Sequence, residues 1–163
     1  MKRYILIASV VIGAAAFVAP PASAQTESLS ATYTEHIAPP PGNSRCPDDA
    51  FACGSGTATG FGGFTTERTF DESCGCIVRT LTFSDGSTLA LTETLVSLTG
   101  PGNSGPNSHE SPTAEGNPGL WSWTWTVGSG TGTFAGATGS GTDDFLSAGL
   151  IASGTISGIV TTP

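Results

Sequence analysis

Three ionisable residues lie on strand faces that are otherwise apolar, and this pattern is the strongest indication of chemistry in the sequence. Glu35, Arg79 and Glu93 each fall in the apolar phase of a segment that alternates between apolar and polar residues. Burying a charged side chain costs free energy unless it is paired, so the pattern predicts that the three residues meet inside the protein. A carboxylate in a water-poor cavity could then act as a general acid or base, with Arg79 holding an anionic or carbonyl group. The alternatives are a structural ion pair, or a barrel-end position where these faces reach solvent.

Four aromatic residues are further candidates for contact with a ligand. Tyr33 lies on the same strand face as Glu35. Trp121, Trp123 and Trp125 form a stripe along one face of residues 120–127. An exposed stripe could stack against sugar rings, whereas an inward-facing stripe would fill the core or line a cavity. Because the opposite face consists of Ser and Thr, the pattern favours the inward-facing arrangement.

A hairpin over residues 76–98 positions two of the charged residues. A two-residue turn would place the apolar faces of its strands on opposite sides of the ribbon. A three-residue loop that ends at Gly86, with this glycine in the left-handed conformation, pairs Ile77 with Glu93. The second register keeps the apolar faces together, and it predicts that Arg79 and Glu93 are diagonal neighbours on the buried face.

Other motifs offer little chemistry. Asp48-Asp49 and Asp143-Asp144 lack the alternating ligands of a calcium loop and are interpreted as solvated loop acids. Neither His36 nor His109 has the neighbours of a catalytic base. The sequence contains no Gly-x-Ser-x-Gly, His-Glu-x-x-His or phosphate-binding loop, so we expect no metal and no cofactor.

The first residues have the pattern of a secretory signal. Lys2 and Arg3 precede an apolar stretch over residues 4–18, which is too short to span a membrane, and Ala22-Ser23-Ala24 resembles a cleavage site. Cleavage after Ala24 would leave 139 residues without any lysine. We therefore expect a secreted protein with no membrane association after cleavage.

Charge and composition exclude two classes of protein. The chain after the signal carries thirteen acidic residues against three arginines, and Arg45 and Arg68 are assigned no role beyond surface or strand polarity. A net charge of −10 excludes binding to nucleic acid through its phosphates. Gly, Ser and Thr make up 63 of the 139 residues, which excludes a helical bundle.

The four cysteines indicate disulfides. Cys46, Cys53, Cys74 and Cys76 do not have the spacing of a zinc site, and an even number in a small exported domain usually forms two bridges. A direct bond between Cys74 and Cys76 would close a small, strained ring, so the spacing predicts cross-links between the two clusters. Both cross-pairings remain open.

The strand patterns predict an all-β domain. Residues 54–70 form either two strands or one strand bent at Gly62-Gly63, and residues 99–119, rich in Gly and Pro, form a long mobile loop. With the hairpin, the total is about eight strands, the number at which an antiparallel sheet can close into a barrel. The remaining strands are predicted over residues 28–37, 120–127, 139–145 and 150–160. The organisation is thus a signal over 1–24, a strand and disulfide-tethered loop over 25–53, and the rest of the barrel over 54–163.

Three segments resemble a known family. Residues 130–139, Gly-Thr-Gly-Thr-Phe-Ala-Gly-Ala-Thr-Gly, are similar to a signature of the allene oxide cyclase and dirigent barrels. Residues 53–57 and 79–87 resemble small secreted bacterial proteins of that superfamily, which lack a defined activity. The resemblance implies an eight-stranded calycin-like barrel with a central cavity, which in the plant members holds a lipid epoxide or phenoxy radicals without a cofactor.

These observations lead to one expected function and two alternatives. We expect a secreted, non-enzymatic barrel that binds a small apolar or amphipathic molecule, with the tryptophan stripe and Phe residues as walls. Arg79, Glu93 and Glu35 would be its polar anchor. The alternatives are a cofactor-free cyclase or isomerase, and an extracellular module that interacts with carbohydrates or surfaces.

Overall fold

The computed structural model describes residues 23–37, 45–47, 49–100, 103–104 and 119–163. Most of the predicted signal, the Pro-rich part of the tethered loop, and most of the predicted loop over 99–119, including His109, lie outside the described residues. In the part of the chain that is described, no helix is both long enough and apolar enough to cross a membrane.

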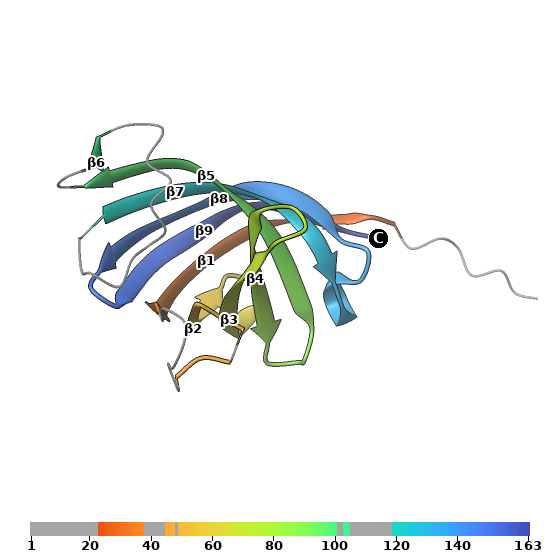
Figure 1. The fold of residues 1–163 in the computed structure, drawn as a ribbon. Helices are drawn as coiled ribbons and strands as arrows, with labels where there is room; N and C mark the ends of the chain where they lie inside the picture. The colour runs from red at the N-terminus through yellow and green to blue at the C-terminus, as the bar shows by residue number, and fades with distance from the viewer. Residues whose placement is uncertain (1–22, 38–44, 48, 101–102, 105–118) are drawn as a thin grey trace, which may run out of the picture.

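Eight strands form a closed antiparallel barrel, as predicted (Figure 1). Each strand pairs with the next one along the chain, and β1 pairs with β9 to close the sheet. A two-residue strand, β6, pairs with the end of β5, and a single 3-10 turn, η1, precedes β8. The elements are β1 (Gln25–Ile37), β2 (Ala52–Ala58), β3 (Gly62–Asp71), β4 (Cys76–Phe83), β5 (Thr88–Gly100), β6 (Asn103–Ser104), β7 (Gly119–Gly130), η1 (Gly132–Phe134), β8 (Thr138–Ala148) and β9 (Ile151–Thr162).

Alternation along the strands determines which side chains enter the barrel. In β1 every second residue from Leu29 to Ile37 is buried, and the intervening residues are exposed or partly exposed. In β7 the three tryptophans are buried, and in β8 Asp143 and Phe145 are buried between exposed neighbours. This period of two, repeated around a closed sheet, makes one set of side chains the interior of the molecule.

The predicted hairpin register is confirmed. Ile77 pairs with Glu93, and Gly86 has a φ of +85°, the left-handed conformation that a three-residue loop requires at its end. The Ser87 backbone N–H donates to the Asp85 carboxylate at 2.9 Å, which orders the turn. Residues 54–70 form two strands rather than one bent strand, because the chain turns between Ala58 and Gly62.

Glycines in β8 and β9 leave room for the largest interior side chain. A Cβ placed on Gly141 or Gly158 would collide with the Trp125 indole and with the backbone of the neighbouring strand. At Gly154 a Cβ would lie 2.5 Å from the Phe145 Cβ and 2.7 Å from the Tyr33 hydroxyl. The glycine content of these strands therefore makes the interior deep enough for aromatic side chains.

The two ends of the barrel differ. We call one the η1 end: it carries η1, the start of β1, the end of β9, and the β2–β3 and β4–β5 turns (Figure 1). The other, the disulfide end, carries residues 45–51 and the β3–β4 and β8–β9 turns. At the η1 end four phenylalanines pack with ring centroids 4.9 to 6.0 Å apart; they are Phe61, Phe64, Phe83 and Phe134.

Candidate functional site

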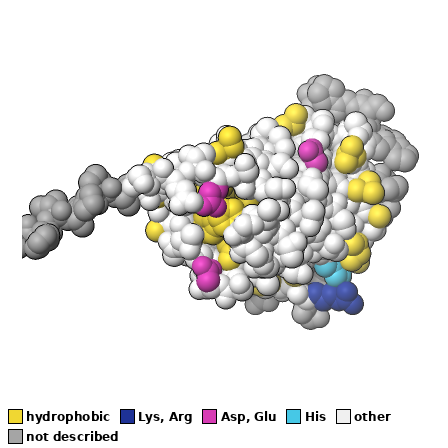
Figure 2. Space-filling model, turned by 180° about the vertical axis from the view of Figure 1, so that it is seen from behind, with side chains coloured by type: hydrophobic (Ala, Val, Ile, Leu, Met, Phe, Trp, Pro, Cys, Tyr) yellow, Lys and Arg dark blue, Asp and Glu magenta, His cyan; other side chains and the backbone are white. Residues whose placement is uncertain are grey.

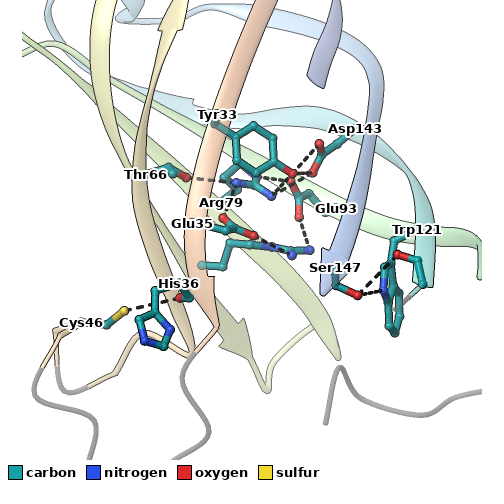
Figure 3. Close-up of polar contacts among 12 residues, drawn as sticks. Tyr33, Glu35, His36, Cys46, Thr66, Arg79, Glu93, Trp121, Asp143 and Ser147 are labelled. Carbon is teal, nitrogen blue, oxygen red and sulfur yellow. Dashed lines mark hydrogen bonds and ion pairs between the residues drawn. The ribbon is translucent and has the colours of Figure 1, made fainter. Parts of the chain in front are cut away.

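A cluster of charged side chains fills the middle of the barrel (Figure 3). Arg79 is its centre: its Nε donates to Glu93 Oε1 at 2.7 Å and its Nη1 to Glu35 Oε2 at 2.8 Å. Its Nη2 donates to Asp143 Oδ2 at 2.8 Å. The predicted meeting of Glu35, Arg79 and Glu93 is thus confirmed, and all three residues are buried.

Tyr33 belongs to the same cluster. Its hydroxyl donates to Asp143 Oδ1 at 2.8 Å and accepts a hydrogen bond from Arg79 Nη2 at 3.0 Å. The Arg79 guanidinium also lies 4.3 Å from the centre of the Tyr33 ring, and its Nη1 donates to the Thr66 hydroxyl at 3.1 Å. Arg79 therefore has partners on four strands besides its own, β1, β3, β5 and β8. Its side chain is completely buried.

Sequence reasoning missed two members of this cluster. Arg68, predicted to provide only surface or strand polarity, is buried and donates to Glu93 Oε2 at 2.9 Å and to Glu35 Oε1 at 3.3 Å. Asp143, predicted to be a solvated loop acid, is completely buried on β8. The alternation of the strands could have revealed both. Arg68 lies on the same strand face as Phe64 and Thr66, and Asp143 lies on the same face as Phe145.

The cluster contains more negative than positive charge. Two arginines face three carboxylates, and burial raises the pKa of Asp143 to about 6 despite the nearby Arg79. Burial also acts to raise the pKa of Glu93, but Arg68 and Arg79 outweigh it and the pKa is lowered. Burial raises the pKa of the Tyr33 hydroxyl well above its usual range. The five charges therefore sum to −1 when Asp143 is ionised and to zero when it is protonated.

The three tryptophans are buried, so the inward-facing interpretation is confirmed and the exposed sugar platform is wrong. Two of them have partners for the indole N–H. Trp121 Nε1 donates to the Ser147 hydroxyl at 3.0 Å, and Trp125 Nε1 donates to the Thr142 carbonyl oxygen at 3.0 Å. Trp123 Nε1 has no acceptor among the described residues, although it is buried.

Arg68 lies at the border between the charged cluster and an aromatic layer. Its guanidinium carbon is 5.0 Å from the Phe145 ring centre, 5.2 Å from that of Trp123 and 5.5 Å from that of Phe51. These rings provide cation–π contacts. Its Nε is buried and, like Trp123 Nε1, finds no acceptor in the described part of the chain. Two unpaired donors thus occur on side chains that contact each other.

The predicted cross-links between the cysteine clusters are wrong. Cys46 is bonded to Cys53, and Cys74 to Cys76. The register explains this: Cys53 is opposite Glu67 on β3, whereas Cys76 is opposite Asp71. The two positions are about 13 Å apart along β3 and two strand spacings apart across the sheet. A disulfide bridges a Cα separation of at most about 7 Å.

One group of possible metal ligands occurs among the described residues. Asp71, Cys74 and Cys76 bring their ligand atoms within 4.8 Å of one another. Both sulfurs are in a disulfide, so neither is available as the thiolate that binds a metal. Of the other acidic candidates, Asp49 and Asp144 are exposed, and Asp48 lies outside the described residues.

The outer wall carries two further features. A shallow depression of about 330 Å³ between β1 and β2 is lined mainly by Ser and Thr, without charged groups. At the disulfide end, exposed aliphatic side chains form a row across β5, β7, β8 and the β8–β9 turn, where Leu120 pairs with Leu146 (Figure 2). We call it the apolar row; its members are Val96, Leu120, Leu146, Leu150 and Ile151.

Comparison with known proteins found no match among family models, curated proteins or solved structures. Functional conclusions therefore depend on the geometry of this chain.

Proposed function

We propose that the protein is an exported barrel that binds one small apolar or amphipathic molecule in the half of its lumen nearest the disulfide end. Export is supported by the N-terminal sequence pattern and by the two disulfides, which persist in oxidising compartments. The resemblance to the allene oxide cyclase and dirigent barrels supports a ligand held in the lumen. An eight-stranded barrel is also of the size that either fills with side chains or holds one small ligand.

The observation that carries the proposal is the aromatic layer around Arg68. Three rings surround a buried cation whose Nε has no acceptor among the described residues, and the neighbouring Trp123 has a second donor of this kind. Leaving a buried donor unpaired costs about 1 to 3 kcal/mol, which a bound acceptor would recover. Aromatic walls with a few convergent polar groups are typical of small-molecule sites.

Entry to this layer requires one side chain to move, and Phe51 is the candidate. Among the three rings around Arg68, Phe51 alone comes from a loop rather than a barrel strand, and it is partly exposed. It lies between Cys46 and Cys53, so the disulfide limits how far the loop can travel. We propose that Phe51 covers the site and is displaced when the ligand enters.

Binding is better supported than catalysis. Each carboxylate of the cluster is paired with an arginine and has an exposure of 0 or 1%. A general acid or base must come within hydrogen-bonding distance of its substrate, directly or through one water. The cyclase alternative would therefore require the ion pairs to separate during the reaction, whereas binding beside Arg68 leaves them intact.

Native mass spectrometry of the protein from the medium of cells that export it tests this proposal. We expect a small molecule that stays bound under native conditions and is released on denaturation. As a matched pair, Phe51→Ala should lose or exchange it faster, and Phe134→Leu at the η1 end should retain it. The proposal would be contradicted if no molecule co-purified with the protein and the purified protein bound neither acetophenone nor isopropylbenzene.

The apolar row favours a second function, an extracellular module that interacts with a surface. Its side chains are 40 to 56% exposed, and exposed apolar surface of this kind is often functional. Sedimentation of the protein with phosphatidylcholine vesicles tests it. Leu120→Ser combined with Leu146→Ser should abolish any association. Ile159→Ser, which removes an equally exposed side chain outside the row, should not. Equal behaviour of the two variants would exclude this function.

A further inference from the structure

We propose that the ligand is neutral and that it carries a carbonyl-type oxygen, which accepts hydrogen bonds from Trp123 Nε1 and Arg68 Nε. This inference rests on the proposed function, because it specifies the chemistry of the molecule held in the same layer.

The tryptophan stripe provides an internal comparison. All three indoles are buried on one face of β7, and two of the N–H groups donate to acceptors at 3.0 Å. The third, on Trp123, has no acceptor among the described residues. Since Trp121 and Trp125 are saturated, a new acceptor in this layer can bind to Trp123 and not to the other two.

Arg68 has the same selectivity among its own nitrogens. Its Nη1 donates to Glu35 and its Nη2 to Glu93, so each terminal nitrogen uses one of its two N–H groups to hold the charged cluster. Nε is the one nitrogen of this guanidinium that has no acceptor among the described residues, and it is buried. The guanidinium carbon lies 5.2 Å from the Trp123 ring centre, so the two side chains that carry unpaired donors are in contact.

Charge determines the kind of acceptor. The cluster has three carboxylates for two arginines, so Arg68 offers no surplus positive charge to an anion. A carboxylate ligand would add a fourth negative charge where little water can screen it, which is costly. A ketone, ester or amide oxygen accepts the same hydrogen bonds without that cost. The aromatic rings then accommodate the apolar remainder of the ligand.

Three probes of nearly the same shape separate these possibilities: acetophenone, isopropylbenzene and benzoate. The readout is the ¹⁵N-resolved NMR spectrum of the wild-type chain at pH 7.5, together with calorimetric affinities. We expect acetophenone to shift the Trp123 indole N–H and the Arg68 Nε–H downfield. The Trp121 and Trp125 indole N–H signals, which are already hydrogen-bonded, should move little. Isopropylbenzene should bind without the downfield shifts, and benzoate should bind most weakly.

Phenylalanine variants of the tryptophans give the energetic test. Trp123→Phe should lower the affinity for acetophenone about fivefold relative to isopropylbenzene, the effect of one hydrogen bond of about 1 kcal/mol. Trp121→Phe, the matched control, should leave the ratio of the two affinities unchanged.

Each contrary result has a distinct meaning. If isopropylbenzene and acetophenone bind and Trp123→Phe leaves their ratio unchanged, the assigned donors are wrong but the proposed function stands. Tighter binding of benzoate than of acetophenone would overturn the neutral ligand. If none of the three probes binds to the wild-type chain, both the inference and the proposed function are contradicted.

Discussion

The two halves of the barrel are stabilised in different ways. Towards the η1 end the interior is made of phenylalanine rings and aliphatic side chains, which need only to fit together. From the middle to the disulfide end it contains five charged residues and three indole N–H groups, each of which needs a partner as well as space. The same alternating strands therefore build one half that depends on shape and another that depends on completed hydrogen bonds.

This difference indicates where function can lie. A well-packed apolar core offers no hydrogen bond to a polar ligand. The polar core has two donors that find no acceptor in the part of the chain that the structure describes, so it can still form hydrogen bonds. The buried charges also serve as a specificity device, since Arg79 can satisfy its partners only when the strands are in the observed register. Four predictions test this contrast.

Removing the central cation should have the largest effect. Arg79→Met leaves three buried carboxylates with one arginine, and breaking a buried ion pair costs about 3 to 5 kcal/mol. Urea denaturation at pH 7 measures this loss, and the loss should shrink at pH 4.5 as the excess carboxylates take up protons. Thr82→Met, on the exposed face of β4, is the control and should change stability little. A loss below about 1 kcal/mol for Arg79→Met would mean that the cluster is not a unit.

Truncating a side chain in the apolar half should lower the free energy of unfolding by the same amount at every pH. Phe134→Ala removes a ring that is 1% exposed and packed 4.9 Å from Phe83, at an expected cost of about 3 to 4 kcal/mol. Because the rings carry no titratable group, the loss of free energy of unfolding should be equal at pH 4.5 and pH 7. A strong pH dependence would show that the two halves are coupled.

Asp143 should make the polar half less stable as the pH rises. Its pKa in the folded state is about 6, above the ordinary value of 3.8, so the folded state binds this proton more tightly. The resulting stabilisation is complete below about pH 4 and is lost as the pH rises through 6; it amounts to about 3 kcal/mol at most.

Asp143→Asn keeps the shape of the side chain and removes the titration. Denaturation midpoints between pH 4.5 and pH 7.5 should fall for the wild-type chain and stay flatter for the variant. The pKa of Glu93 is lowered in the folded protein, so its contribution to stability changes at more acidic pH, below this window. Parallel curves would contradict the prediction.

The smallest expected effect is the difference in stability between variants of two tryptophans, of which one donates an indole hydrogen bond and the other does not. Trp121→Phe should cost about 1 kcal/mol more than Trp123→Phe, because it deprives the Ser147 hydroxyl of its donor. Trp123→Phe loses no hydrogen bond to any described residue and removes a buried N–H that has no acceptor among them. The volume change is the same at both sites, so thermal unfolding of the two variants isolates the polar contribution. Equal losses would mean that Trp123 Nε1 is satisfied in solution.

Most of the fold could be predicted from the sequence because alternation and turn residues act locally. The phase of β1, the hairpin ending at Gly86 and the inward tryptophans each depend on a short stretch of chain. The disulfides could not be predicted in this way. Whether the two cysteine clusters can be cross-linked depends on the register of β2 against β3, and the spacing of the cysteines carries no information about that register.

The candidate site was predicted in part for the same reason. Glu35, Arg79 and Glu93 were identifiable because each interrupts a run of apolar residues. Arg68 shares its phase with Phe64 and Phe70 but also with Thr66, so the apolar pattern around it is broken. Asp143 shares its phase with Phe145 but follows Gly141, so it interrupts no run of apolar residues. The unpaired donors depend on which acceptors lie nearby in three dimensions, which no periodicity reveals.

The connections of Arg79 also determine how the barrel can form. Its partners Glu35 and Asp143 lie 44 residues before it and 64 residues after it. Until β8 arrives, the guanidinium lacks one of its carboxylates and Tyr33 lacks the acceptor for its hydroxyl. A chain in which only the first strands have paired is therefore not a stable intermediate. We expect a slow, single-step closure in which the last third of the chain determines whether the first third is folded.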